Sequence, residues 1–473
     1  AVTLNEAAVR AIAGGFARFL RARLGKENFR VSVGRDSRLS GEAIARTLCE
    51  TLAACGAAVT DLGLCTTPAM FMTTVTGESP FEAAVMITAS HLPWNRNGLK
   101  FFTAAGGAES ADVREILRLA AEETPLAPGG SVAQGEFMET YAAILREKII
   151  TAANGNEKPL AGKRIVVDAG NGAGGFFAER VLAPLGADTA GSRYLDPDGH
   201  FPNHVPNPEL PEAMDSIRAA VLESHADFGI IFDTDVDRAG AVLADGEELN
   251  RNRLIALISA ILLREHPGTA IVTDSITSTG LAEFIASHGG VHRRFRRGYR
   301  NVINEALRLN AAGHDCQLAI ETSGHAALKE NYFLDDGAYL VTRFLMEIAA
   351  GRELESLLAG LREPVESREF RLKILAEDFR AAGTAVLDSL TEYVKEQPGW
   401  TLAPDNCEGV RVNLDKAHGD GWFLLRLSLH DPILPLNIES DKEHGARTIA
   451  RELAPFLAQQ TGIDASAALE FTL

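Results

Sequence analysis

Short apolar runs alternate with longer amphipathic stretches along most of the chain. Runs bounded by glycine, proline or charged residues are typical of buried strands, and stretches with helical periodicity are typical of helices. The residues Thr3-Leu4-Asn5-Glu6 resemble a capping box at the start of an alanine-rich helix. We expect strands at 29–33, 82–88, 163–168, 228–232, 239–244, 270–274, 291–295 and 318–321, and helices at 41–55 and 254–263. This alternation predicts α/β layers with parallel or mixed sheets.

The pattern changes near residue 365, where charged helical sequence leads to Pro398-Gly399 and then to strand-like runs at 409–414 and 422–429. We interpret this segment as a smaller α+β domain. Several domains are expected, because an ordinary domain has about 100–200 residues and the chain has 473. The predicted division is into three α/β domains with mixed sheets, at 1–148, 149–250 and 251–362, and the α+β domain at 363–473.

Composition and charge narrow the classes of function. The chain is 46% hydrophobic and 23% charged, as in globular proteins, and its net charge of −18 argues against nucleic-acid or anionic-membrane partners. An anionic ligand would need local positive clusters, such as those at 293–300 and around Arg426. The five cysteines include no CxxC pair, which favours a reducing compartment, cytoplasmic or organellar such as a plastid. Since the sequence does not begin with Met, we expect that an N-terminal piece precedes it.

A loop that leaves a probable buried strand carries the first candidate chemistry. The apolar run ends at Thr88-Ala89-Ser90-His91, and the chain returns to apolar sequence at Lys100. Ser90 is a candidate nucleophile or phosphoryl carrier, His91 a candidate for proton transfer, and Lys100 a charge partner for an anion. The alternative is an ordinary strand-to-loop turn with a capping serine.

Three aspartates follow another apolar run, at positions 233, 235 and 237. In an extended backbone alternate side chains point the same way, so Asp233, Asp235 and Asp237 are predicted to converge on one cation. Hard carboxylate oxygens suit Mg²⁺. An EF-hand is excluded, because Arg238 stands where its loop needs glycine and Ala244 where it needs glutamate.

Two further loops carry groups suited to a sugar phosphate. Glu321 and Ser323 follow a predicted strand, and the carboxylate could accept hydrogen bonds from vicinal hydroxyls. Arg426, Ser428 and His430 alternate, so in an extended segment they would share one face and could donate to a phosphate.

Residues 170–175 match the G-x-G-x-x-G pattern after a predicted strand, with Asp196 farther along. This permits a dinucleotide-binding, oxidoreductase hypothesis. That reading gives no role to the aspartates or to the two loops above. We therefore interpret the glycines as a tight strand-to-helix turn.

Together, these loops resemble those of the α-D-phosphohexomutase family, which includes phosphoglucomutases, phosphomannomutases and phosphoglucosamine mutases. Residues 88–91 and 97–100 resemble the family's phosphoserine loop, 233–238 its magnesium loop, 321–325 its sugar-binding loop and 426–432 its phosphate-binding loop. The segment 197–208 also fits, and Gly298-Tyr299-Arg300 resembles a third-domain loop whose basic residue faces the ligand.

The resemblance implies a four-domain enzyme built around a central cleft, which interconverts hexose 1- and 6-phosphates through a phosphoserine and a 1,6-bisphosphate intermediate. Its implied cofactors are Mg²⁺ and a glucose 1,6-bisphosphate-type activator, and we expect a monomer or homodimer. The implied metal site is Ser90, Asp233, Asp235 and Asp237, with Ser90, His91, Lys100 and Arg238 as the catalytic residues. The implied substrate-binding residues are Arg300, Glu321, Ser323, His325, Arg426, Ser428 and His430.

The sequence departs from the family pattern at a few positions. Leu92 replaces an Asn of the serine loop, and His430 and Asp431 replace Thr and Glu. The family's N-terminal Arg-Gly segment is not among these residues. Phosphoglucosamine mutases typically carry Gln where Thr322 stands, so glucose or mannose phosphate is the preferred substrate here. The alternatives are a phosphoglucosamine mutase, a hexose-1,6-bisphosphate-forming enzyme and a weakly active sugar-phosphate-binding protein.

Overall fold

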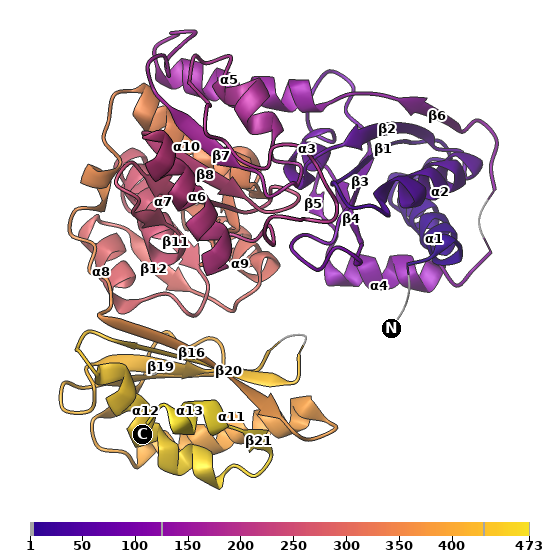
Figure 1. Ribbon diagram of the computed structural model, residues 1–473. Helices are drawn as coiled ribbons and strands as arrows, with labels where there is room; N and C mark the ends of the chain where they lie inside the picture. Colours follow the sequence, from indigo (N-terminus) through magenta and orange to yellow (C-terminus); the bar gives the residue numbers. More distant parts are fainter. Residues whose placement is uncertain (1–3, 124–125, 429–430, 473) are drawn as a thin grey trace. The chain divides into compact units, whose positions relative to one another are not determined.

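The structure is a computed structural model that describes residues 4–123, 126–428 and 431–472 (Figure 1). The chain divides into two compact units. The first unit comprises Ala1–Leu254 and Ser323–Leu357, and the second comprises Ile255–Thr322 and Leu358–Leu473. Within the described ranges, no helix combines the length and the apolar character that crossing a bilayer requires.

The first sheet of the first unit is mixed, with the strand order β5-β4-β3-β1-β2-β6. Strands β3, β1, β2 and β6 are parallel, and β4 and β5 continue the sheet in antiparallel fashion. The strands are β1 (Arg30–Arg35), β2 (Ala58–Leu64), β3 (Ala83–Ile87), β4 (Leu99–Thr103), β5 (Gly106–Gly107) and β6 (Ser131–Gln134). The helices of this segment are α1 (Glu6–Leu24), α2 (Gly41–Ala54), α3 (Thr67–Met72) and α4 (Ser110–Leu119). Residues 88–98, the serine loop, connect β3 to β4.

Alternation along β1 explains how this sheet is covered. Val31 and Val33 belong to the apolar core that the sheet shares with α1 and α2, and Figure 1 shows these helices beside it. Ser32 points to the other face, where its hydroxyl lies 2.7 Å from that of Thr73, which follows α3. Alternate side chains of β1 therefore pack against helices on opposite faces of the sheet.

The second sheet has the order β10-β9-β8-β7, with β7 parallel to β8 and the other pairs antiparallel. Ile231 packs against α6, whereas the ring of Phe232 lies 5.3 Å from that of Phe177 on the opposite face. Because both faces are covered, these strands read as continuous apolar runs. The elements are β7 (Ile165–Asp168), η1 (Phe177–Leu182), α6 (Pro211–Ser224), β8 (Phe228–Phe232), β9 (Ala239–Leu243) and β10 (Glu248–Leu249).

The segment 323–357 completes the first unit. An antiparallel pair, β14 (Ala326–Leu328) and β15 (Leu334–Asp335), precedes α10 (Gly337–Ala349), with η2 (Lys329–Asn331) between the strands and η3 (Glu355–Leu358) after the helix. Helix α10 packs against α5 (Met138–Ala152). Asp336 caps α10 by accepting from the Tyr339 amide, and it also accepts from the Tyr141 hydroxyl of α5 at 2.6 Å.

The second unit contains a parallel three-strand arrangement, β12-β11-β13, and a larger antiparallel sheet. The parallel part consists of α7 (Arg251–Glu265), whose first turn lies before the unit boundary, β11 (Ala270–Thr273), α8 (Thr279–Ser287), β12 (Val291–Arg294), α9 (Tyr299–Ala311) and β13 (Cys316–Ile320). The carboxyl ends of β11 and β13 lead into residues 274–278 and 321–322.

The antiparallel sheet has the order β17-β18-β19-β20-β16-β21. Its strands are β16 (Glu366–Ile374), β17 (Trp400–Leu402), β18 (Val410–Leu414), β19 (Gly421–Leu425), β20 (Ile433–Ser440) and β21 (Ile463–Asp464). Helices α11 (Phe379–Lys395), α12 (Gly445–Gln459) and α13 (Ser466–Glu470) form one apolar core with it.

The sequence predicted the α/β layers and the C-terminal α+β part, and both are confirmed. Two local expectations need correction. The helix near the N-terminus is capped by Asn5, whose side chain accepts from the Ala8 amide, while Thr3 lies outside the described residues. The strand expected at 422–429 is observed at Gly421–Leu425, and residue 429 lies outside the described residues.

Candidate active site

The serine loop places Ser90 at the carboxyl end of β3. Ser90 has a φ of 49°, in the left-handed region that few non-glycine residues adopt. Its hydroxyl donates to Asp233 Oδ2 at 2.9 Å and lies 3.3 Å from His91 Nδ1. Ser90 and His91 of the serine loop are therefore grouped with Asp233 of the aspartate loop, as the sequence predicted.

The departure at Leu92 has a simple structural outcome. The Leu92 side chain is about half exposed, whereas its backbone amide donates to Ala89 O at 3.0 Å. The Leu92 carbonyl accepts from Arg38 at 2.6 Å. Because the backbone contacts do not involve the side chain, the leucine leaves the turn that carries Ser90 intact.

The three aspartates converge, although not by the route that the sequence suggested. Carboxylate oxygens of Asp233, Asp235 and Asp237 all lie within 4.8 Å of one another and are buried. The loop between β8 and β9 is a turn with Val236 at a φ of 67°, not an extended segment. The hairpin turn, rather than strand alternation, therefore brings the carboxylates together.

Basic side chains surround this acidic group. Lys100, on β4, donates to Asp235 Oδ2 at 2.8 Å and to Asp237 Oδ2 at 2.6 Å. Arg238 donates to Asp233 Oδ2 at 3.2 Å and to the Ser90 hydroxyl at 3.2 Å. Opposite charges thus hold the serine hydroxyl, the carboxylates and the lysine in one hydrogen-bonded group.

The acidic group fits a divalent cation. Asp235 Oδ1 and Asp237 Oδ1 are buried and accept no hydrogen bond from any residue that the structure describes. Burial and the charges of Asp237 and Asp235 raise the pKa of Asp233 well above its usual value. A cation would relieve this mutual repulsion, and three carboxylates form the oxygen-rich donor set that Mg²⁺ and similar ions take.

His91 and His325 have opposite protonation preferences. Burial, and then the positive charge of Arg238, lower the pKa of His91 to about 4, so its ring is neutral at neutral pH. Burial alone would lower the pKa of His325 as well, but Asp335 and Asp237 outweigh it and raise that pKa to about 9. One imidazole can therefore accept a proton, while the other carries positive charge.

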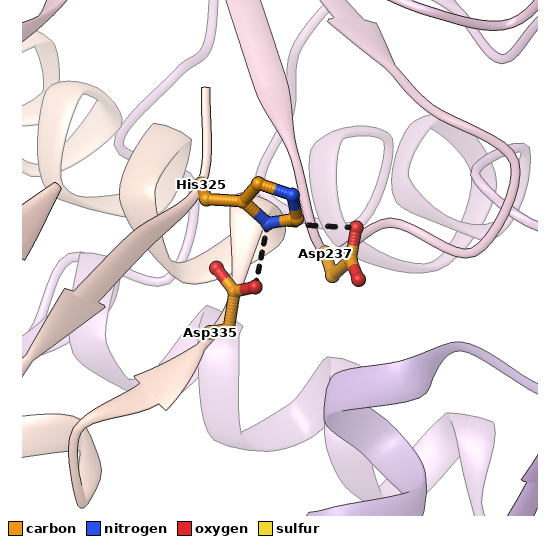
Figure 2. Close-up of side chains that lie close together, drawn as sticks. All are labelled: Asp237, His325 and Asp335. Carbon is orange, nitrogen blue, oxygen red and sulfur yellow. Dashed lines mark hydrogen bonds and ion pairs between the residues drawn. The ribbon is translucent and has the colours of Figure 1, made fainter. Parts of the chain in front are cut away.

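Figure 2 shows the His325 ring between its two carboxylate partners. His325 Nδ1 lies 2.6 Å from Asp335 Oδ2 and 3.9 Å from Asp237 Oδ1. These three groups are close enough to hold a metal ion, but a protonated imidazole has no lone pair to offer one. His325 therefore acts as a positive charge beside the aspartates, and Asp335 is a partner that sequence reasoning missed.

Two other missed contacts hold the aspartate loop. The Thr67 hydroxyl donates to Asp235 Oδ2, and the Thr67 amide donates to the Asp235 carbonyl at 2.9 Å. A Cβ atom at Gly172 would lie 2.6 Å from the Thr234 carbonyl oxygen, so only glycine allows this approach. The turn at 170–175 leads from β7 toward η1, as predicted, and it packs on the aspartate loop.

In the second unit, the loop after β13 contacts the start of α9. Glu321, which is buried, accepts from the Gly298 amide at 2.6 Å, one residue before α9 begins. Arg300 lies in the first turn of that helix. Ser323 is buried in the first unit, just beyond the unit boundary.

Asp274, at the end of β11, is a buried acid that the sequence did not single out. It accepts from the Thr322 hydroxyl at 2.8 Å, and its Oδ2 lies 3.7 Å from Arg297 Nε. Thr322 is the residue whose identity favoured glucose or mannose phosphate in the sequence analysis. Its hydroxyl donates its hydrogen bond to Asp274 within the protein.

Arg426 and Ser428 directly follow β19. Their backbone amides donate to Pro435 O and Ile433 O, each at 3.1 Å. Arg426 is buried, and burial lowers the pKa of its guanidinium. Buried Arg426 Nε has no hydrogen-bond partner among the described residues. His430, the third expected phosphate donor, lies outside the described residues.

Comparisons with known proteins agree along the chain. Residues 1–126, 139–246 and 250–365 match the three α/β/α domains of the phosphoglucomutase/phosphomannomutase family in order. A phosphomannomutase/phosphoglucomutase of Pseudomonas aeruginosa is 32% identical over 93% of this chain and 89% of its own. A phosphoglucomutase of Neisseria gonorrhoeae is 30% identical over 88% and 85%. The crystal structure of a family protein from Burkholderia thailandensis has a TM-score of 0.82 and 28% identity, covering 98% of this chain and 95% of that one.

Proposed function

The chain belongs to the phosphoglucomutase/phosphomannomutase family, and we propose that it interconverts hexose 1-phosphates and hexose 6-phosphates through a phosphorylated Ser90. Glucose and mannose phosphates are the proposed substrates. The proposal rests on the contacts of the Ser90 hydroxyl. This hydroxyl lies within hydrogen-bond distance of Asp233 and Arg238, beside two further buried aspartates. Phosphoryl transfer requires this kind of positioning and charge neutralisation.

The proposed cycle has two transfers. In the first, the O–P bond at phosphorylated Ser90 breaks and an O–P bond forms at the free hydroxyl of the bound hexose phosphate, which releases a proton. The resulting 1,6-bisphosphate turns over, its other sugar O–P bond breaks while an O–P bond forms again at the Ser90 oxygen, and the sugar oxygen that is left takes up the proton. A glucose 1,6-bisphosphate-type activator is the proposed source of the first phosphoryl group.

Asp233, Asp235 and Asp237, together with the Ser90 oxygen, are the proposed ligands of Mg²⁺. A bound Mg²⁺ would supply positive charge against the phosphoryl oxygens. Arg238 already contacts the Ser90 oxygen at 3.2 Å, so its guanidinium stabilises negative charge there. Lys100 adds a second cation, which holds Asp235 and Asp237 in their observed orientation.

The neutral ring of His91 is the group best prepared to accept the proton of the attacking hydroxyl. It lies 3.3 Å from the Ser90 oxygen, and its pKa is lowered to about 4. Lys100 donates two hydrogen bonds to carboxylates, which suits an ammonium group better than a base. We assign proton transfer to His91 and charge neutralisation to Lys100.

Sugar and phosphate recognition is assigned to the loops already described. Glu321 and Ser323 are the proposed partners of the sugar hydroxyls. His325 supplies positive charge beside the aspartates. Arg300, Arg426 and Ser428 are the proposed partners of the phosphate that does not react, and His430 stays a prediction from the sequence. Arginine suits this task, because its planar fork matches phosphate oxygens.

An assay of the purified protein tests the reaction and the sugar together. The full chain would be supplied with Mg²⁺ and catalytic glucose 1,6-bisphosphate, and with the 1-phosphates of glucose, mannose, glucosamine or N-acetylglucosamine in turn. We expect formation of glucose and mannose 6-phosphates at the highest kcat/KM. A clear preference for the glucosamine compound would instead assign the chain to the phosphoglucosamine mutases.

The serine assignment has its own test. We expect Ser90→Ala to lower turnover by about 10³-fold or more, because it removes the oxygen that carries the phosphoryl group. Ser131→Ala, on exposed strand β6, is the matched control and should behave as the wild type. Incubation with ³²P-labelled bisphosphate should label the wild type and the control but not Ser90→Ala. Wild-type turnover by Ser90→Ala would refute the assignment.

A further inference from the structure

Arg38 lies buried beneath the serine loop, at the end of a short turn after β1. Its guanidinium donates to four backbone carbonyls of that loop. These are Leu92 O at 2.6 Å, Pro93 O at 2.8 Å, Arg96 O at 3.0 Å and the carbonyl of Ser90 itself. Only a planar group with five N–H donors can serve so many acceptors at once.

A buried carboxylate balances this charge and reaches Ser90 from the other side. Arg38 Nε lies 3.1 Å from Asp36 Oδ2, and both side chains are fully buried. The same oxygen accepts from the Thr88 hydroxyl at 2.7 Å. The Thr88 oxygen in turn accepts from the Ser90 amide at 2.9 Å. Thr88 therefore holds the Ser90 backbone at its N–H, and Arg38 holds it at its C=O.

These hydrogen bonds to the Ser90 backbone matter because Ser90 adopts a left-handed conformation with a φ of 49°. Such a conformation is unfavourable for a non-glycine residue and persists only where its surroundings enforce it. The described contacts that enforce it come from Arg38 and Thr88.

A second segment covers the guanidinium. A Cβ atom at Gly199 would lie 2.9 Å from Arg38 Cα, so the chain passes directly over this residue. The Phe201 ring centroid lies 5.3 Å from the Arg38 guanidinium carbon, within the range of a cation–π contact. The segment 197–202, which lies within the segment 197–208 that resembles the family, therefore covers the Arg38 side chain.

We propose that Arg38 is a positioning residue for phosphoryl transfer. Anchored by Asp36 and covered by Phe201, it fixes the backbone of Ser90 so that the serine oxygen stays beside Asp233. Arg38 does not reach the reacting atoms, since its donors are used by the loop carbonyls and Asp36. The proposal rests on the proposed function of Ser90.

Arg38→Lys in the full chain is the main test. Lysine keeps the positive charge but lacks the planar array of N–H donors of the guanidinium, so the loop carbonyls lose most of their hydrogen bonds. We expect kcat to fall by about 10²-fold, the effect of a misplacement of roughly 1 Å, with KM for glucose 1-phosphate changed by less than about threefold. Amide hydrogen exchange in residues 88–98 should become about tenfold faster, with other segments unchanged. Arg35→Gln, which removes a neighbouring arginine paired with Glu42, is the control.

Asp36→Asn is the second variant, because it keeps the shape of the anchor and serves if Arg38→Lys does not fold. It should lower kcat about tenfold and raise exchange in the same segment. Wild-type kcat together with wild-type protection of 88–98 in either folded variant would overturn the proposal. If the wild-type protein itself shows no mutase activity, the proposed function fails, whereas the exchange measurement still decides whether Arg38 holds the loop.

Discussion

At the scale of single residues, the sequence identified candidate reacting groups, but their protonation depends on neighbours from other segments of the chain. His91 and His325 are chemically identical side chains. Burial, and then the positive charge of Arg238, lower the pKa of His91. Asp335 and Asp237 stand beside His325 and raise its pKa, against burial. One can therefore serve as a base, and the other supplies charge.

This difference is directly measurable. In metal-free protein with isotopically labelled histidine, we expect the His91 ring to stay neutral between about pH 5.5 and 8, where an ordinary histidine titrates. The His325 ring should stay protonated at pH 7 and lose its proton only as the pH approaches about 9. NMR chemical shifts report both states, and His91→Gln and His325→Gln assign the signals. An ordinary titration of either ring near pH 6.5 would contradict the charge distribution described for the site.

At the scale of elements, the aspartate loop depends on a neighbouring glycine-rich turn. The glycine pattern of this turn is also typical of dinucleotide-binding proteins. The glycines at 170–175 form a turn after β7, and Gly172 allows the backbone of this turn to touch that of Thr234. The Ala173 amide donates to the Thr234 carbonyl at 2.8 Å. The turn thus fixes the backbone between Asp233 and Asp235.

We therefore expect Gly172→Ala to weaken metal binding. Its Cβ would push Thr234 outward and spread the carboxylates. The Mg²⁺ concentration for half-maximal activity should rise about tenfold, with a smaller effect on the thermal unfolding midpoint. Gly462→Ala is the matched control, since a Cβ there meets no atom within 4 Å. An unchanged Mg²⁺ dependence in Gly172→Ala would show that the turn does not position the aspartates.

At the scale of the whole molecule, a buried polar cluster joins the two sheets of the second unit. Arg411, on β18, donates to Ser275 O at 2.7 Å and to Thr277 O at 3.1 Å, both after β11. Its guanidinium stacks on Trp422, 3.6 Å from the ring centroid. Trp422 Nε1 donates to the Glu439 carboxylate at 3.1 Å. Burial outweighs the charge of Arg411 and raises the pKa of Glu439 to about 7.

This shift predicts a pH-dependent stability. A carboxyl group whose folded pKa exceeds its unfolded value near 4.5 stabilises the protein at low pH, and this contribution is lost as the pH rises through about 7. Glu439→Gln keeps an acceptor for Trp422 without ionising. It should therefore match the wild type at about pH 4 and exceed its stability by up to about 3 kcal/mol near pH 8.5. Thermal unfolding midpoints across this range provide the measurement. Glu443→Gln, at an exposed position, should show no such pH-dependent gain in stability.

The sequence alone determined the layers, the reacting residue types and their order along the chain. Apolar runs such as 228–232 specify buried strands, and the hydroxyl of Ser90 and the carboxylate of Asp233 are functional groups that the sequence itself supplies. Which oxygen atoms come together, in contrast, depends on how the segments pack in three dimensions. The turn at Val236 gathers the aspartates, Arg38 holds a loop that lies more than 50 residues further along the chain, and the Asp237 of one loop lies beside the His325 of another. Such contacts depend on burial and on distances between segments remote in sequence, which no local pattern of residues encodes.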